Sequence, residues 1–209
     1  FVFGYTDLNA KKMSAKYIWE LKPQLAKGLK TLSAPVPGLG SDEKAVAAMG
    51  MGMNVPNAIE FAKQQVKHMK ANPFKCKELA DLNDALAGAE MALQQPLPPF
   101  VSNVSGFNLV VKSGNFTGPM PTDVKANVIV AVKQPEQLIG MAKTLMPPLA
   151  NLQLKPDGKP VALPPELNAP GIETPFVAMN ANGIAASVGK GEEANLGALL
   201  NKKAVANPP

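Results

Sequence analysis

The sequence contains no arginine, so all 21 of its basic residues are lysines. The planar guanidinium of arginine is the usual reader of phosphate groups and guanine edges, whereas the lysine ammonium is only a point charge. The lysines are spread along the whole chain, and aromatic residues make up only 5% of it. Nucleic-acid-binding proteins instead concentrate basic residues and interleave them with aromatic ones. The net charge of +5 therefore predicts a solvated surface and no nucleic-acid partner.

Cysteine and histidine are almost absent, with Cys76 and His68 the single residue of each type. One cysteine cannot form an internal disulfide or a cysteine-rich metal site, and a free thiol is most often a small buried hydrophobe. One histidine likewise falls short of the clustered ligands that a metal ion needs. We therefore expect no metal site and no cofactor.

Long apolar runs are absent too, because no stretch of the sequence approaches the roughly 20 residues that span a bilayer. We therefore expect no transmembrane segment in this chain. The sequence begins at Phe1 rather than at a methionine, so we expect a processed product or a fragment. Any signal peptide or membrane tether would then lie upstream.

Hydrophobic residues make up 46% of the chain, which predicts an ordinary globular core. Helical patterns come first and strand patterns follow, and this order favours an α+β fold with a mainly antiparallel sheet. We expect residues 1–209 to form a single α+β module, complete or cut from a longer or duplicated protein. Its helical part would cover about 9–95 and would pack on a sheet formed by about 105–203.

The N-terminal segment predicts one strand followed by a helix. Residues 1–8 alternate large and small side chains, and we expect this strand to join the sheet of the C-terminal half. Leucines at helical spacing favour a helix over 18–32, kinked or divided at Pro23. Alternatively, Tyr17, Trp19 and Leu21 lie on one face of a strand, and Pro23 opens the next helix.

Three further helices are expected before residue 96, at about 41–49, 54–72 and 75–93. Leu79, Leu82, Leu86 and Leu93 would form the inner face of the last one, with Cys76 one turn before them. In the second half, Asn182-Gly183 indicates a two-residue hairpin turn, and Glu192 and Glu193 would begin a closing helix. One more helix is expected over 134–146, and the tail after 203 should fray. The expected strands are 107–116, 123–133, 161–163, 175–179 and 184–188.

Met49-Gly50-Met51-Gly52-Met53 is the most unusual motif of the sequence. Thioether groups bind Cu(I), and three methionines at a spacing of two could reach one ion on a flexible backbone. Methionine also lines adaptable apolar grooves, or fills a mobile loop that leads into a helix. We expect Met49, Met51 and Met53 to be ligand-binding residues in an apolar groove, in preference to a copper site.

A row of carboxylates is the main alternative candidate for a functional site, and it would be a catalytic one. Glu78, Asp81 and Asp84 share one helix face, where they could act as a general acid–base pair. With His68 they would define a hydrolase-like enzyme. However, the row flanks the leucine stripe on its solvent side, and no nucleophile motif accompanies it. We therefore assign no catalytic residue, and keep the hydrolase as the alternative.

Four short runs within about residues 50–165 resemble those of a known group of proteins. The runs Asn-Pro-Phe-Lys-Cys76-Lys-Glu-Leu, Leu-Asn-Asp-Ala, Pro96-Leu-Pro-Pro-Phe and Lys155-Pro-Asp-Gly-Lys-Pro-Val161 resemble uncharacterised bacterial proteins that are predicted to be exported, often as lipoproteins. The resemblance implies a cell-envelope or secreted location. It also implies that Cys76 could pair with a cysteine outside this chain.

These observations together predict a non-enzymatic binding or structural module of the cell envelope. Its partner would be an apolar ligand or another protein. A purely structural domain of a larger assembly is the third interpretation.

Overall fold

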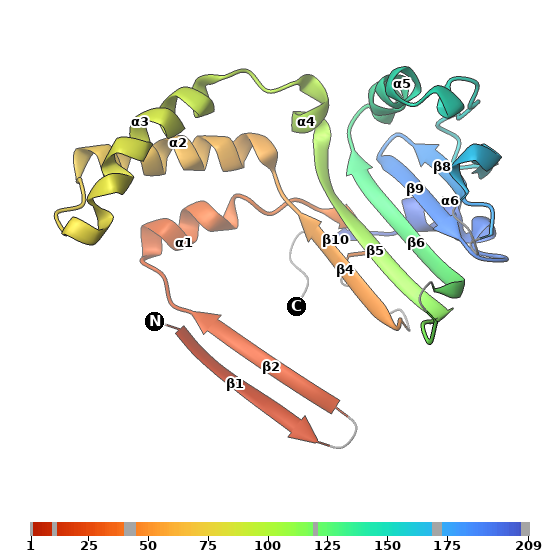
Figure 1. Cartoon of the computed structure of the whole chain (residues 1–209), viewed down its shortest axis with the longest axis horizontal. Helices are drawn as coiled ribbons and strands as arrows, with labels where there is room; N and C mark the ends of the chain where they lie inside the picture. The colour runs from red at the N-terminus through yellow and green to blue at the C-terminus, as the bar shows by residue number, and fades with distance from the viewer. Residues whose placement is uncertain (1, 10–11, 40–44, 119–120, 169–172, 206–209) are drawn as a thin grey trace.

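A computed structural model describes residues 2–9, 12–39, 45–118, 121–168 and 173–205. Its largest element is a six-stranded antiparallel sheet in the order β4-β5-β6-β9-β8-β7, shown in Figure 1. The prediction of an α+β fold is confirmed. The strands of this sheet are β4 (Ala47–Gly52), β5 (Val104–Asn115), β6 (Thr122–Val132), β7 (Val161–Ala162), β8 (Phe176–Asn180) and β9 (Gly183–Val188).

One face of the sheet holds the main core. The closing helix α6 (Leu196–Leu200) lays its three leucines, all buried, against this face. Their partners from the strands include Ile129, Ala178 and Ala185. Fully burying one leucine side chain is worth about 1.5–3 kcal/mol, so this cluster supplies much of the stability of the sheet. The expected closing helix is present, although α6 begins at Leu196 rather than at Glu192.

A second, smaller cluster joins the segment before β4 to the sheet. Val36 and Leu39 are buried against Ala131 of β6. β3 (Val36–Pro37) also pairs with β10 (Ala204–Val205). The prediction that the whole tail after 203 frays is therefore wrong for residues 204 and 205, and residues 206–209 lie outside the described part of the chain.

The N-terminal strand does not join the main sheet. β1 (Val2–Asn9) pairs along its whole length with β2 (Lys12–Trp19), and Figure 1 shows this hairpin lying apart from the other strands. Phe1 lies outside the described residues. The favoured helix over 18–32 is wrong, and the alternative is observed without Leu21: the strand ends at Trp19, and α1 (Pro23–Lys30) begins at the proline. Aromatic and β-branched residues before Trp19 favour a strand, and proline is well placed in a first helical turn.

The central helices are present, although they do not pack on the sheet as expected. α2 (Val55–Ala71) begins after Asn54, whose side-chain oxygen accepts a hydrogen bond from the Asn57 N–H at 3.0 Å. The short helix η1 (Lys77–Leu79) leads into α3 (Ala80–Gln94), which packs on α2. Figure 1 shows this helical hairpin extending away from the sheet. Because the sheet does not cover α3, the expected inner face is incomplete: Leu86 is buried, whereas Leu79 and Leu82 are exposed.

The remaining elements are short and lie in the second half of the chain. The expected helix over 134–146 is α5, and the expected hairpin near Asn182 joins β8 to β9, with Asn180 opposite Gly183. The turn is thus Ala181-Asn182, one residue earlier than predicted. The other bounds are α4 (Pro99–Asn103), α5 (Pro135–Leu145), η2 (Pro147–Leu149), η3 (Pro165–Leu167) and η4 (Glu193–Asn195).

Candidate functional site

The three candidate methionines lie on or directly after the edge strand β4. Met49 pairs with Leu109 of β5, and Met51 pairs with Phe107. The motif is therefore neither the mobile loop nor part of the helix over 41–49 that the sequence suggested; residues 41–44 of that helix lie outside the described part. Glycine is usually disfavoured in strands, so the sequence of this segment did not indicate one.

The glycines of β4 have a packing role that explains the motif. A Cβ atom on Gly52 would collide with the carbonyl oxygen of Ala34, and one on Gly50 would meet the Leu39 side chain. The segment that contains Ala34 and Leu39 can therefore press closely on one side of β4. Side chains alternate along a strand, so the methionines project to the opposite side.

On that opposite side, six apolar residues form two cross-strand rows. Met49, Leu109 and Val128 are paired in the first row, and Met51, Phe107 and Val130 in the second. We call these six residues the open face. Met49 and Met51 are 59% and 53% exposed, and the other four residues are partly buried. Intervening residues of the same strands, which point to the core face, are buried: Asn108, Val110, Asn127 and Ile129.

The open face deepens into a groove where β4 leads into α2. The groove has a volume of about 420 Å³ and opens to solvent. Only apolar atoms are exposed inside it. Its lining consists of Met51, Met53, Val55, Val104, Ser105, Gly106, Phe107, Val128 and Val130. No charged residue occurs between positions 45 and 58, so nothing on this segment could neutralise a charged ligand group.

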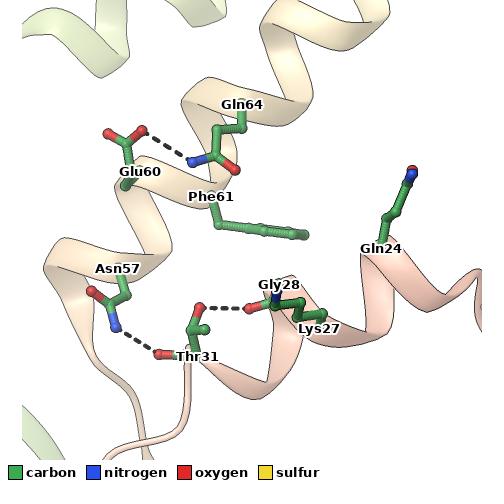
Figure 2. A pocket seen from close by; sticks show the side chains of 8 residues that line it. All are labelled: Gln24, Lys27, Gly28, Thr31, Asn57, Glu60, Phe61 and Gln64. Carbon is green, nitrogen blue, oxygen red and sulfur yellow. Dashed lines mark hydrogen bonds between the residues drawn. The ribbon is translucent and has the colours of Figure 1, made fainter.

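A polar pocket of about 340 Å³ lies between α1 and α2, and Figure 2 shows its lining. The ring of Phe61 points from α2 toward Gly28 of α1. The Asn57 side-chain amide donates to the Thr31 carbonyl oxygen at 2.8 Å, and the Thr31 hydroxyl donates to the Gly28 carbonyl oxygen at 2.7 Å. The Asn57–Thr31 bond joins the start of α2 to the end of α1, so the pocket is the seam between the two helices and a weaker candidate than the open face.

The structure places the other candidate residues on exposed surface. His68 is exposed near the end of α2, and Asp81 and Asp84 are exposed on α3. Within the described residues, no three histidine, cysteine, aspartate or glutamate side chains form a group that could hold a metal ion. Cys76 is also exposed, contrary to the expected burial, because it precedes η1 outside the helical packing.

Sequence reasoning missed a polar cluster on the core side of the sheet. The Glu192 carboxylate accepts hydrogen bonds from the Lys112 ammonium at 2.8 Å and from the Asn127 amide at 3.2 Å. Burial raises the pKa of Glu192, but these hydrogen bonds and the charges of Lys112 and Lys125 outweigh that effect and hold the pKa below its usual value. The carboxylate thus stabilises the sheet through a tertiary contact.

Comparison with known proteins gave no relative. No protein-family model, curated protein or solved structure matches the chain. Within the described residues, no helix has both the length and the apolar character needed to cross a membrane.

Proposed function

We propose that the chain is a non-catalytic binding module of the cell envelope, and that it holds a protein partner on its open face. The observation that carries the proposal is the pair of uncharged rows, Met49-Leu109-Val128 and Met51-Phe107-Val130, whose two methionines are exposed and whose other four residues are only partly buried. The envelope location rests on the resemblance of about 50–165 to exported bacterial proteins.

Removing apolar surface from water is worth about 25 cal/mol per Å², so a partner that covers these rows gains a driving force without any charge pairing.

The shape of the groove favours a protein over a small apolar ligand. A small-molecule site usually encloses 70–90% of its ligand, roughly speaking, and fixes the ligand with a few polar groups. Here the groove opens to solvent and exposes no polar atom. It also continues into the flat rows of the open face. Such a surface suits an extended or helical segment that contributes apolar side chains along its length.

A peptide selection tests this function. Random peptides displayed on phage are selected against the full chain, and their affinities are measured by calorimetry for the wild type, Met51→Lys and Met91→Lys. Met91 lies on α3 and is 67% exposed, so its replacement adds the same charge at a distant apolar site. We expect apolar peptides whose affinity falls about tenfold or more, or 1.4 kcal/mol, with Met51→Lys alone.

Peptides that bind Met51→Lys as tightly as the wild type would place the binding surface elsewhere and contradict the proposal. A parallel titration with dodecanoate tests the small-ligand alternative. Tight, saturable binding of dodecanoate that displaces the peptides would favour the apolar-ligand interpretation over the protein partner.

A further inference from the structure

β4 is an edge strand of the main sheet. It lies last in the strand order, with β5 on its inner side and no strand on its outer side among the described residues. Its pairing with β5 runs without a register shift from Ala47 to Gly52. An edge of this kind presents free backbone donors and acceptors, which form a template for another strand.

The hydrogen bonds identify which backbone groups point outward. The Met53 N–H donates to the Ser105 carbonyl oxygen of β5 at 2.7 Å. Because N–H groups of a strand alternate in direction, those of Met51 and Met49 also point toward β5, and those of Gly50 and Ala48 point away from it. At the far end the edge is closed, since the Asn54 N–H donates to the Leu32 carbonyl oxygen. The available edge is therefore short and centred near Met49.

The sequence of this edge contains none of the residue types that normally prevent strand addition. Natural edges are protected by lysine, proline, bulges or covering segments. The sequence Ala-Ala-Met-Gly-Met-Gly contains no charged residue and no proline, although the chain carries 21 lysines. Side chains at the start of the strand are exposed, including Val46 at 64% and Met49 at 59%.

We infer that a second copy of this chain pairs with β4 through an antiparallel, two-fold contact centred on Met49. Ala48 and Gly50 of each copy would then exchange backbone hydrogen bonds, and Met49 would lie opposite the second copy's Met49 at a Cα distance of about 4.5 Å. The two sheets would become one continuous sheet with the two open faces side by side.

The charge distribution favours a second copy as the occupant. Each chain carries a net charge of +5, which repels another copy over most of the surface. Residues 45–58 carry no charge, so two copies can approach here without opposing like charges. An antiparallel contact about a two-fold axis also needs only one strand that is compatible with itself, and β4 meets that requirement.

Sedimentation equilibrium of the full chain tests the inference from micromolar to submillimolar concentration. We expect the wild type and Met91→Lys to form dimers. Met49→Lys and Met49→Glu should each raise the dimer dissociation constant about tenfold or more, because like charges would face one another across the two-fold axis. An equal mixture of these two variants should restore the dimer, since opposite charges would then be paired.

Far-UV circular dichroism and thermal unfolding show whether each variant is folded. A wild type that stays monomeric throughout, or a Met49→Lys variant that dimerises as well as Met91→Lys, would overturn the inference. Failure of the two oppositely charged variants to associate, while the wild type dimerises, would also overturn the Met49-centred contact. Peptide binding by a monomeric chain would leave the proposed function intact.

Discussion

The Lys112 ammonium lies 2.8 Å from the Glu192 carboxylate, and this contact joins β5 to the segment that precedes α6. Glu192 is buried, so replacing its carboxylate with a neutral amide removes the negative charge that pairs with the Lys112 ammonium. We expect Glu192→Gln to lower the free energy of unfolding by about 1–3 kcal/mol, as measured by urea denaturation. Glu193→Gln is the matched control, and an equal loss in both variants would contradict the role of the contact.

The same pair gives stability a defined pH dependence. The folded-state pKa of Glu192 lies below its usual value of 4.5, because hydrogen bonds from Lys112 and Asn127 outweigh the effect of burial. A carboxyl with a lowered pKa contributes stability above its unfolded-state pKa, and loses that contribution as the pH falls through the folded-state pKa. Urea denaturation at a series of pH values below 4.5 should therefore show a shallower decline for Glu192→Gln than for the wild type. Parallel declines would contradict the assignment.

Gly106 lies where the backbones of β5 and β4 approach each other closely. Its φ is +147°, and a Cβ atom there would collide with the Met51 carbonyl oxygen. We expect Gly106→Ala to destabilise the protein by at least about 2 kcal/mol, because both the backbone conformation and the close approach become unfavourable. Gly88→Ala, on α3 with open space around it, should instead stabilise the protein by about 0.5–1 kcal/mol. Thermal unfolding of both variants measures the difference, and similar effects would contradict the packing described here.

Two leucines of α3 test how far the helical hairpin is packed. Leu86 is 8% exposed and Leu82 is 47% exposed. Leu86→Ala should cost about 2–4 kcal/mol, whereas Leu82→Ala should cost less than about 0.5 kcal/mol. Chemical denaturation compares them. A larger loss for Leu82→Ala would mean that another surface covers that side of the helix.

Cys76 is exposed and is the only cysteine of the chain. We expect its thiol to react fully with an aromatic disulfide reagent in the native protein, at a rate close to that in denaturant, because the fold does not shield it. Spectrophotometric titration measures both rates. A thiol that reacts only after unfolding would contradict its exposed position. Pairing with a cysteine outside the chain stays a prediction.

Long periodic segments could be predicted from the sequence. β5 and β6 are rich in β-branched and other apolar residues, and α2 has an asparagine cap followed by Pro56, so local patterns specify them. Local patterns failed at residues 12–19. The leucine spacing after these residues favoured a helix over 18–32. The pattern of Tyr17 and Trp19 already indicated the strand as an alternative.

Features that depend on distant residues could not be predicted. Lys112 and Glu192 are 80 residues apart in sequence, and nothing in either segment indicates the other. Pairing with β5 holds β4 as a strand, and the close approach of Ala34 and Leu39 requires glycine at positions 50 and 52. The methionine motif did indicate an apolar surface. Its open face depends on the helical hairpin lying away from the sheet, which no local pattern encodes.

Methionine-methyl NMR tests the open face most directly. The full chain is labelled with ¹³C at its methionine methyl groups, the signals of Met49, Met51 and Met91 are assigned by substitution, and a selected peptide is added. The account predicts that the Met49 and Met51 signals shift in proportion to binding, while the Met91 signal stays in place. A shift of Met91 with unchanged Met49 and Met51 signals would contradict it.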